Sequence, residues 1–252
     1  MRVFARRAHD RNTLRVVDWS DFDAALFDLD GVITPTAEVH MHAWAEMFGA
    51  FLAAEGIDEP YTDADYFTYV DGKPRYDGVR SFLESRGIEL PQGEPDDSPD
   101  DRTVCGLGNR KNAVFEEVLE RDGVKAYPGS RRLVDALAER GVKLAVVSSS
   151  RNAPEVLRVA DMIDYFPTIV DGRVATDRHL AGKPAPDTFL YAAQQLGVEP
   201  SRAVVLEDAL SGVAAGKAGH FGLVVGVDRG VGAEALTESG ADQVVSDLEE
   251  LL

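Results

Sequence analysis

The stretch Ala24-Ala25-Leu26-Phe27-Asp28-Leu29-Asp30-Gly31-Val32-Ile33-Thr34 is a short apolar run that ends in two aspartates and a glycine. An apolar run of this length before a turn signal predicts a buried parallel strand. Side chains alternate along a strand, so Asp28 and Asp30 would point the same way if strand geometry persisted. Their charges repel, and a hard cation such as Mg²⁺ between them would relieve the repulsion. The stretch therefore predicts a metal site and a candidate nucleophile, although an isolated D-x-D pair fits a solvated strand end equally well.

The composition of the 252-residue chain is that of a globular protein, with 44% hydrophobic and 28% charged residues. A formal net charge of −18 disfavours nucleic acid as a partner, because phosphate backbones require a basic surface. The single cysteine excludes an internal disulfide. No apolar run has membrane-spanning length, and the arginine-rich N-terminus lacks the apolar segment of a secretory signal. We therefore expect a cytoplasmic monomer with no nucleic-acid or membrane partner.

The pattern of the chain changes near residue 120. Residues 38–120 are helical in pattern and contain a Pro-, Asp- and Gly-rich loop, after which strands and helices alternate. Such alternation predicts a mostly parallel sheet with right-handed crossovers. We expect an α/β protein with an N-terminal arm at 1–20, a Rossmann-like core at 21–37 and 121–252, and an inserted α-helical cap at 38–120. Strands are expected at 143–147, 168–170, 203–206 and 223–227, and a loop at 106–112.

Four polar clusters follow expected strands or open expected helices: Asp28 with Asp30, Ser148 to Asn152, Lys183, and Glu207 with Asp208. The carboxyl ends of parallel strands share one sheet edge, so acids from different strands could hold one Mg²⁺ there. A serine hydroxyl and the N–H groups of the following helix can bind phosphate oxygens, and a lysine adds a compact positive charge. Each cluster alone is weak evidence, but together they indicate one site.

The sequence resembles the haloacid dehalogenase-like phosphotransferases. Asp28 to Thr34, Ser148, Gly182-Lys183-Pro184 and Glu207-Asp208 match the four motifs of that family in order, over residues 22 to 230. The resemblance implies a Rossmann-like core with a helical cap inserted after the first strand. It also implies that Asp28 is the nucleophile, which forms an aspartyl phosphate, and that Asp30 is a general acid/base.

The same resemblance implies the rest of the chemistry. Ser148 and Lys183 would bind the transferring phosphoryl group, and Mg²⁺ would be held by Asp28, Asp30 (through its backbone carbonyl), Glu207 and Asp208. A carboxylate can attack phosphorus only if both negative charges are offset, which Mg²⁺ and Lys183 would do. Asp30 must carry a proton at one step, and we expect the neighbouring carboxylate to raise its pKa.

A closer resemblance is to the β-phosphoglucomutase-like family. It is carried by Thr34 to His40 with Trp44, by Gly72-Lys73-Pro74-Arg75 and Arg110-Lys111-Asn112 in the cap, and by Ser148 to Asn152 in the core. It implies that Arg75 binds the phosphate that is not being transferred and that Lys111 contacts or positions the sugar.

Other positions of this match concern cap closure and the far end of the substrate. Thr36 and His40 would sit at the hinge and couple closure of the cap to Asp30. Arg151 and Asn152 would face the distal phosphate, and Trp44 and Ser150 are further candidates for substrate binding. His40 and Trp44 are four residues apart on one helix face, a spacing that is more often packing than chemistry.

These resemblances lead to an enzyme hypothesis with a small phosphorylated sugar as substrate. The first hypothesis is a β-phosphoglucomutase, which interconverts β-D-glucose 1-phosphate and D-glucose 6-phosphate through a β-glucose 1,6-bisphosphate. The alternative is a Mg²⁺-dependent sugar-phosphate phosphatase, in which water takes the phosphoryl group. A third class, a binding protein on a retained fold, is disfavoured because every expected catalytic carboxylate is present.

Overall fold

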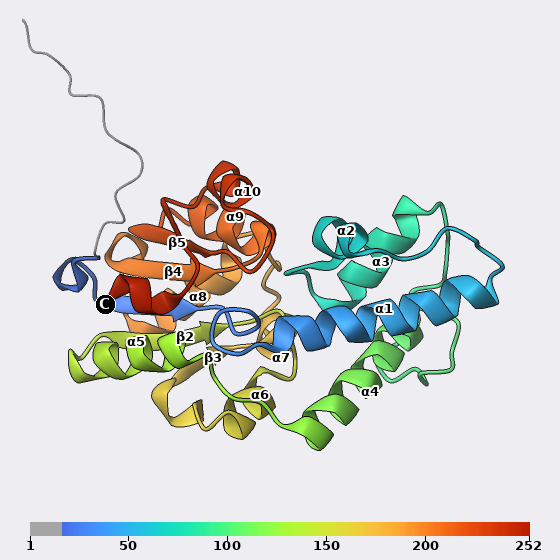
Figure 1. The fold of residues 1–252 in the computed structure, drawn as a ribbon, viewed down its shortest axis with the longest axis horizontal. Helices are drawn as coiled ribbons and strands as arrows, with labels where there is room; N and C mark the ends of the chain where they lie inside the picture. Colours follow the sequence, from blue (N-terminus) through green and yellow to red (C-terminus); the bar gives the residue numbers. More distant parts are fainter. Residues whose placement is uncertain (1–16) are drawn as a thin grey trace, which may run out of the picture.

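The computed structural model describes residues 17–252 and shows a sheet-centred part beside a group of helices (Figure 1). The sheet has six strands in the order β3-β2-β1-β4-β5-β6, and every pairing is parallel. The central position of β1 places the residues that follow it between those that follow β2 and β4. The strands are β1 (Ala24–Phe27), β2 (Lys143–Val147), β3 (Thr168–Val170), β4 (Ala203–Glu207), β5 (Leu223–Val227) and β6 (Gln243–Val245).

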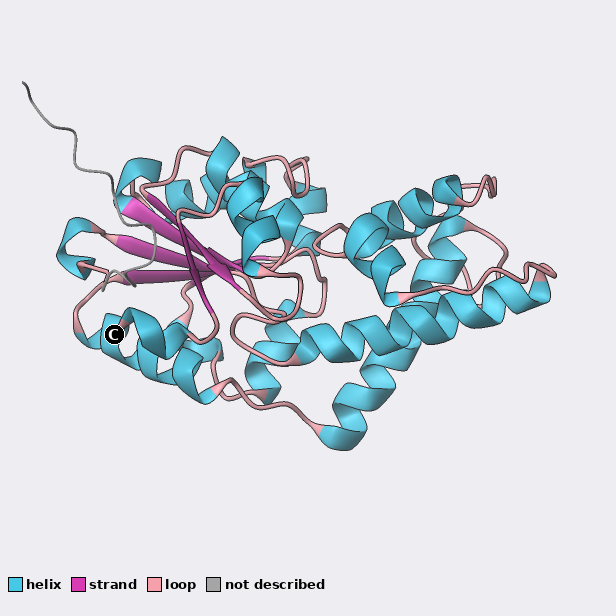
Figure 2. Cartoon of the chain, turned by 45° about the horizontal axis from the view of Figure 1, so that its top comes forward, coloured by secondary structure: helices cyan, strands magenta, loops and turns pink. Residues whose placement is uncertain are grey.

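Helices cover both faces of the sheet, with the strands running between them (Figure 2). Ala25 and Phe27 of β1 pack on the face covered by α5 and α6, whereas Ala24 and Leu26 pack on the face covered by α8, α9 and α10. This alternation explains why β1 is apolar at every position, since a strand buried on both faces offers no solvated side. The helices are α5 (Pro128–Glu139), α6 (Ala153–Val159), α7 (Gly172–Asp177), α8 (Asp187–Leu196), α9 (Leu210–Ala218) and α10 (Ala233–Ser239).

The inserted helices, which we call the cap, lie between β1 and β2 in the chain and have an apolar core of their own. Trp44, Phe48 and Phe82 stack or tilt against one another within it. The long helices α1 and α4 join the cap to the sheet-centred core (Figure 1). The cap contains α1 (Thr36–Ala54), α2 (Asp63–Asp65), the π-helical turn Tyr66–Val70, α3 (Arg75–Ser85) and α4 (Val104–Asp122).

The predicted α/β class, the parallel sheet and the helical insertion are confirmed, with two corrections. The sheet has a sixth strand, β6, which is only three residues long and was not expected. The expected loop at 106–112 is wrong, because these residues lie inside α4. Its glycines have a packing role: a Cβ at Gly106 would lie 2.3 Å from the carbonyl oxygen of Asp101, and one at Gly108 would lie 2.8 Å from the ring of Tyr76.

Residues 1–16 of the predicted N-terminal arm lie outside the described residues, but residues 17–20 correct that prediction. Val17 and Trp19 are buried in the core cluster, and Trp19–Asp21 form a short 3-10 helix. The indole Nε1 of Trp19 donates to the carbonyl oxygen of Leu251 at 2.9 Å. This contact ties the start of the described chain to its C-terminal turn. Within residues 17–252, no helix is long and apolar enough to cross a membrane.

Replacement of Trp19 tests whether this segment is part of the core. Trp19 is 4% exposed, so Trp19→Ala should lower the free energy of unfolding by about 3–5 kcal/mol through lost burial and a lost hydrogen bond. Urea denaturation followed by far-ultraviolet circular dichroism measures the change. Val159→Ala is the control, because Val159 is 40% exposed and its truncation should cost little. A decrease in unfolding free energy of less than about 1 kcal/mol for Trp19→Ala would show that the segment contributes little to the stability of the core.

Candidate active site

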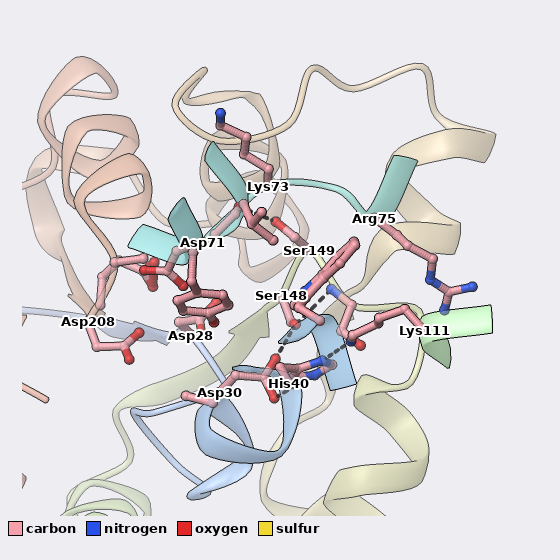
Figure 3. A pocket seen from close by; sticks show the side chains of 18 of the residues that line it. Asp28, Asp30, His40, Asp71, Lys73, Arg75, Lys111, Ser148, Ser149 and Asp208 are labelled. Atoms are coloured by element: carbon pink, nitrogen blue, oxygen red, sulfur yellow. Dashed lines mark hydrogen bonds and ion pairs between the residues drawn. The ribbon is translucent and has the colours of Figure 1, made fainter. Parts of the chain in front are cut away.

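A pocket lies where the carboxyl ends of the strands meet the cap (Figure 3). Asp28 and Asp30 follow β1, Ser148 follows β2, and Glu207 and Asp208 end or follow β4. The cap side of the same pocket comes from four elements or loops and includes His40, Trp44, Asp71, Arg75 and Lys111. Core and cap therefore enclose the pocket together, as the parallel sheet order predicts for a ligand site.

Lys183 is the buried cation that joins the acids of β1 and β4. Its Nζ lies 2.5 Å from Asp28 Oδ1 and 3.4 Å from Glu207 Oε2, and it donates to the carbonyl oxygen of Val147 at 3.1 Å. Burial alone would lower the pKa of Lys183, but the charges of Asp28 and Glu207 outweigh burial and raise that pKa above its usual value. Lys183 is therefore a permanent positive charge beside the predicted nucleophile.

Three carboxylates are placed so that they could hold a metal ion. Oxygen atoms of Asp28, Glu207 and Asp208 lie within 4.8 Å of one another. Glu207 Oε1 is buried and has no hydrogen-bond partner among the residues that the structure describes. Glycines leave room for the cluster: a Cβ at Gly31 would lie 1.8 Å from Asp208 Oδ2, and one at Gly212 would lie 1.8 Å from Glu207 Oε1. An orphaned carboxylate oxygen in an all-oxygen donor set fits a hard divalent cation.

The pKa values of the three carboxyl groups that could hold a metal ion are raised, and a bound cation would lower them. Burial raises the pKa of Asp28, and the nearby Lys183 offsets part of that rise. Burial and then the neighbouring carboxylates raise the pKa values of Glu207 and Asp208 well above the usual range. A bound divalent cation would stabilise the charged forms instead.

Asp30 is held by the first turns of α1. Thr36 donates a short hydrogen bond to Asp30 Oδ1, and His40 Nε2 lies 3.3 Å from the same oxygen. The Oγ of Ser148 lies 3.5 Å from the other carboxylate oxygen. Burial opposes the charge on Asp30, but His40 and the Thr36 hydrogen bond outweigh burial and lower the pKa of Asp30.

This result corrects the expectation that a neighbouring carboxylate raises the pKa of Asp30. The expectation considered only Asp28, whereas two groups from the cap helix also contact Asp30. The raised pKa is that of Asp28 instead, because burial and the neighbouring Asp30 carboxylate together outweigh the charge of Lys183. Asp30 is therefore ionised and able to accept a proton.

Lys111 links α4 to this group. Its Nζ contacts His40 Nδ1 and lies 5.2 Å from the centre of the Trp44 ring and 5.0 Å from that of Phe115. Burial, together with the charge of Arg75, lowers the pKa of Lys111 to about 7. Trp44 lines the pocket and packs in the cap core, so its position is compatible with both a packing role and a substrate-binding role.

A hydrogen-bond chain crosses from cap to core at the far end of the pocket. The guanidinium of Arg75 donates to Asn109 Oδ1 at 3.4 Å and to Asn112 Oδ1 at 2.5 Å. Asn152 donates to the same oxygen of Asn112 at 2.8 Å. Arg151 lies over the ring of Tyr76 at 5.7 Å, which also joins the core to the cap.

The structure brings all the predicted site residues to this one region, in two layers. Eleven of them line the pocket itself: Asp28, Asp30, His40, Trp44, Arg75, Lys111, Ser148, Ser150, Arg151, Glu207 and Asp208. Thr36, Asn152 and Lys183 contact these residues from behind. Sequence reasoning missed Asp71 and Tyr66, which line the pocket from the cap. The only signal was an acid before Gly72, directly beside a motif already noted.

The sequence comparisons agree with this geometry. The family model described as haloacid dehalogenase-like hydrolase matches residues 22–220. A β-phosphoglucomutase of Mycobacterium bovis is 53% identical over 238 residues, which cover 91% of each chain. A phosphorylated carbohydrates phosphatase of Thermotoga maritima is 31% identical, with 91% of this chain and 96% of that protein covered.

A solved structure supports the same fold. The crystal structure of β-phosphoglucomutase from Clostridium difficile has a TM-score of 0.74 to this chain and 25% sequence identity. The match covers 92% of this chain and 93% of that one, so it includes both the sheet-centred part and the helical insertion.

The lowered pKa of Lys111 predicts how stability depends on pH. Between about pH 7 and the usual lysine value of 10.5, the unfolded chain binds a proton at Lys111 that the folded chain does not, so stability should rise with pH. Lys111→Met should remove about 1 kcal/mol per pH unit of that rise. Urea denaturation at pH 7, 8 and 9 measures it, with the exposed Lys217→Met as control. Equal slopes for the wild type and Lys111→Met would contradict the lowered pKa.

Proposed function

Because the chain belongs to the haloacid dehalogenase-like hydrolase family, we propose that it catalyses the β-phosphoglucomutase reaction through an aspartyl phosphate. The substrates would be β-D-glucose 1-phosphate and D-glucose 6-phosphate, with β-glucose 1,6-bisphosphate as the intermediate. A relative of that name at 53% identity supports the proposal. A cytoplasmic location and a monomeric state remain predictions.

The observation that carries the proposal is a pair of separate cationic groups, one lining the cap side of the pocket and one directly behind Asp28 on its core side. Lys183 lies beside Asp28 at the strand ends, whereas Arg75 lies in the cap within the Asn112–Asn152 chain. A hexose bisphosphate has two anionic ends and must bind in both orientations. Ester hydrolysis at one phosphate does not require the second group.

The chain's own residues would perform the transfer as follows. Phosphorylated Asp28 gives its phosphoryl group to O6 of β-glucose 1-phosphate, while Asp30 accepts the proton of that hydroxyl. The bisphosphate then turns around, and the Asp28 carboxylate attacks the phosphorus at C1. The bond from that phosphorus to O1 breaks, and Asp30 returns its proton to O1, which releases glucose 6-phosphate.

Charge and water must both be controlled during these steps. Mg²⁺ would be held by Asp28, Glu207, Asp208 and the Asp30 carbonyl, and would offset negative charge on the phosphoryl oxygens. Ser148 and Lys183 would orient the transferring group, and the cap would exclude the water that hydrolyses an aspartyl phosphate. Thr36 and His40 are suited to hold Asp30 because both belong to the first turns of α1.

The second candidate is a sugar-phosphate phosphatase on the same scaffold. The 31% identical phosphatase of Thermotoga maritima supports it. The first half of the chemistry is identical, and the two candidates differ in whether a sugar hydroxyl or water receives the phosphoryl group from Asp28.

Phosphorus NMR separates these candidates and tests the nucleophile. With β-glucose 1-phosphate, Mg²⁺ and a trace of β-glucose 1,6-bisphosphate, we expect resonances of the bisphosphate and glucose 6-phosphate to appear. Asp28→Asn should abolish turnover, because an amide cannot form the phosphoenzyme, and should leave the circular dichroism spectrum unchanged. Free phosphate without glucose 6-phosphate would reject the mutase. Unchanged activity of Asp28→Asn would reject the nucleophile.

Replacement of Arg75 tests the second anion site. Arg75→Ala should lower kcat/KM for the mutase reaction by about 100-fold or more, since a charge-assisted contact to phosphate is lost. Hydrolysis of a small ester such as p-nitrophenyl phosphate, followed by phosphate release, should change by less than about threefold. Arg80→Ala is the matched control on the same helix, because Arg80 is exposed and pairs with Asp77. Equal losses in both reactions would contradict a distal-phosphate role.

A further inference from the structure

Asp71 is a carboxylate that the cap, not the sheet, brings to the pocket of the candidate cation site, outside the group of three oxygens that could hold the ion. It follows the π-helical turn Tyr66–Val70 and lines the same pocket as Asp28, Glu207 and Asp208. Figure 3 shows it on the side of the pocket where Asp28 and Asp208 lie, away from Arg75. None of the motifs that match the family includes it.

Core side chains fix this segment of the cap. Ser211 donates to the carbonyl oxygen of Asp71 at 3.2 Å, and Ser149 donates to that of Gly72 at 2.8 Å. Gly72 has a φ of +69°, and a Cβ there would lie 2.1 Å from Ser211 Oγ. The backbone at 71–72 thus seats directly on the core, so the Asp71 carboxylate reaches the pocket only while the cap is docked.

Docking the cap therefore adds a negative charge to a negative cluster. Among the described residues, Lys183 is the cation paired with Asp28 and Glu207. Lys73 lines the pocket as well, but its ammonium donates to Ser81 on α3. Repulsion among the carboxylates opposes docking, and a divalent cation converts that repulsion into attraction. The orphaned Glu207 Oε1 independently indicates a cation at this position.

We propose that Asp71 is a positioning residue that couples docking of the cap to occupancy of the divalent-cation site. This inference rests on the cation site of the proposed function. Linkage makes the coupling reciprocal: the cation favours the docked cap, and the docked cap raises affinity for the cation. The sugar pocket would thus close efficiently only when the charge needed for phosphoryl transfer is already in place.

Isothermal calorimetry with Mg²⁺ alone and small-angle X-ray scattering test the coupling without any turnover. The Asp71→Asn variant should bind Mg²⁺ at least about fivefold more weakly than the wild type. Its scattering should show a compact molecule with or without Mg²⁺. The wild type should become more compact when Mg²⁺ is added. Asp58→Asn is the matched control, because it removes the same charge from an exposed loop of the cap and should behave as the wild type.

A second variant keeps the charge and blocks the docking. Gly72→Val places a side chain where Ser211 lies, so it should weaken Mg²⁺ binding to the same extent as Asp71→Asn and should stay extended in Mg²⁺. Mg²⁺ affinity within twofold of the wild type in Asp71→Asn, with cation-dependent compaction retained, would overturn the coupling. So would a raised KM for the sugar with unchanged Mg²⁺ affinity, which would make Asp71 a sugar contact. A wild type that binds no Mg²⁺ would overturn the cation site itself.

Discussion

The ion pair between Lys183 and Asp28 is the constraint on which the site depends. Two acids of neighbouring strands, Asp28 and Glu207, are almost completely buried at the sheet edge, and buried charges of one sign are unfavourable without a counter-charge. The lysine supplies that charge from a loop outside the sheet, at 2.5 Å from Asp28. Gly31 and Gly212 then let the backbone approach Asp208 and Glu207 closely. The apolar strands position these groups, and the buried lysine makes their proximity tolerable.

The second constraint is that α1 contacts both Asp30 and the apolar core of the cap. Its first turns contact Asp30 through Thr36 and His40, while its later turns place Phe48 in the core of the cap. A rotation of the cap about the start of α1 therefore cannot leave Asp30 unaffected. Lys111 extends this connection to α4 through its contact with His40. We therefore expect the protonation of Asp30 to depend on the position of the cap.

The features of the fold and the site that were predicted best from the sequence are those that depend on the local sequence pattern. Strand ends such as Asp28 and Glu207 follow apolar runs, so their meeting at one sheet edge followed from the parallel order alone. Prediction from the sequence failed where contacts between residues far apart in the chain determine the structure. Gly106 resembles a loop residue, but it lies in α4, and glycine stands there because the carbonyl of Asp101 leaves no room for a Cβ. Trp19 is fixed by Leu251, far away in the chain, and β6 pairs only because β5 offers an edge. The pKa of Asp30 depends on His40, whose distance from it no spacing rule gives.

The chemistry at Asp28 does not by itself distinguish a mutase from a phosphatase, because both need the same carboxylates, lysine and cation. The difference arises from what the phosphoenzyme meets next, and the cap controls that encounter. Arg75 donates to Asn112, which Asn152 of the core also contacts, so the proposed second anion site would be complete only when cap and core are joined. In the proposed mutase, an undocked cap would admit water, whereas a sugar phosphate bound to Arg75 would stabilise the closed arrangement. On this proposal, the interface between cap and core would determine whether a sugar hydroxyl or water accepts the phosphoryl group.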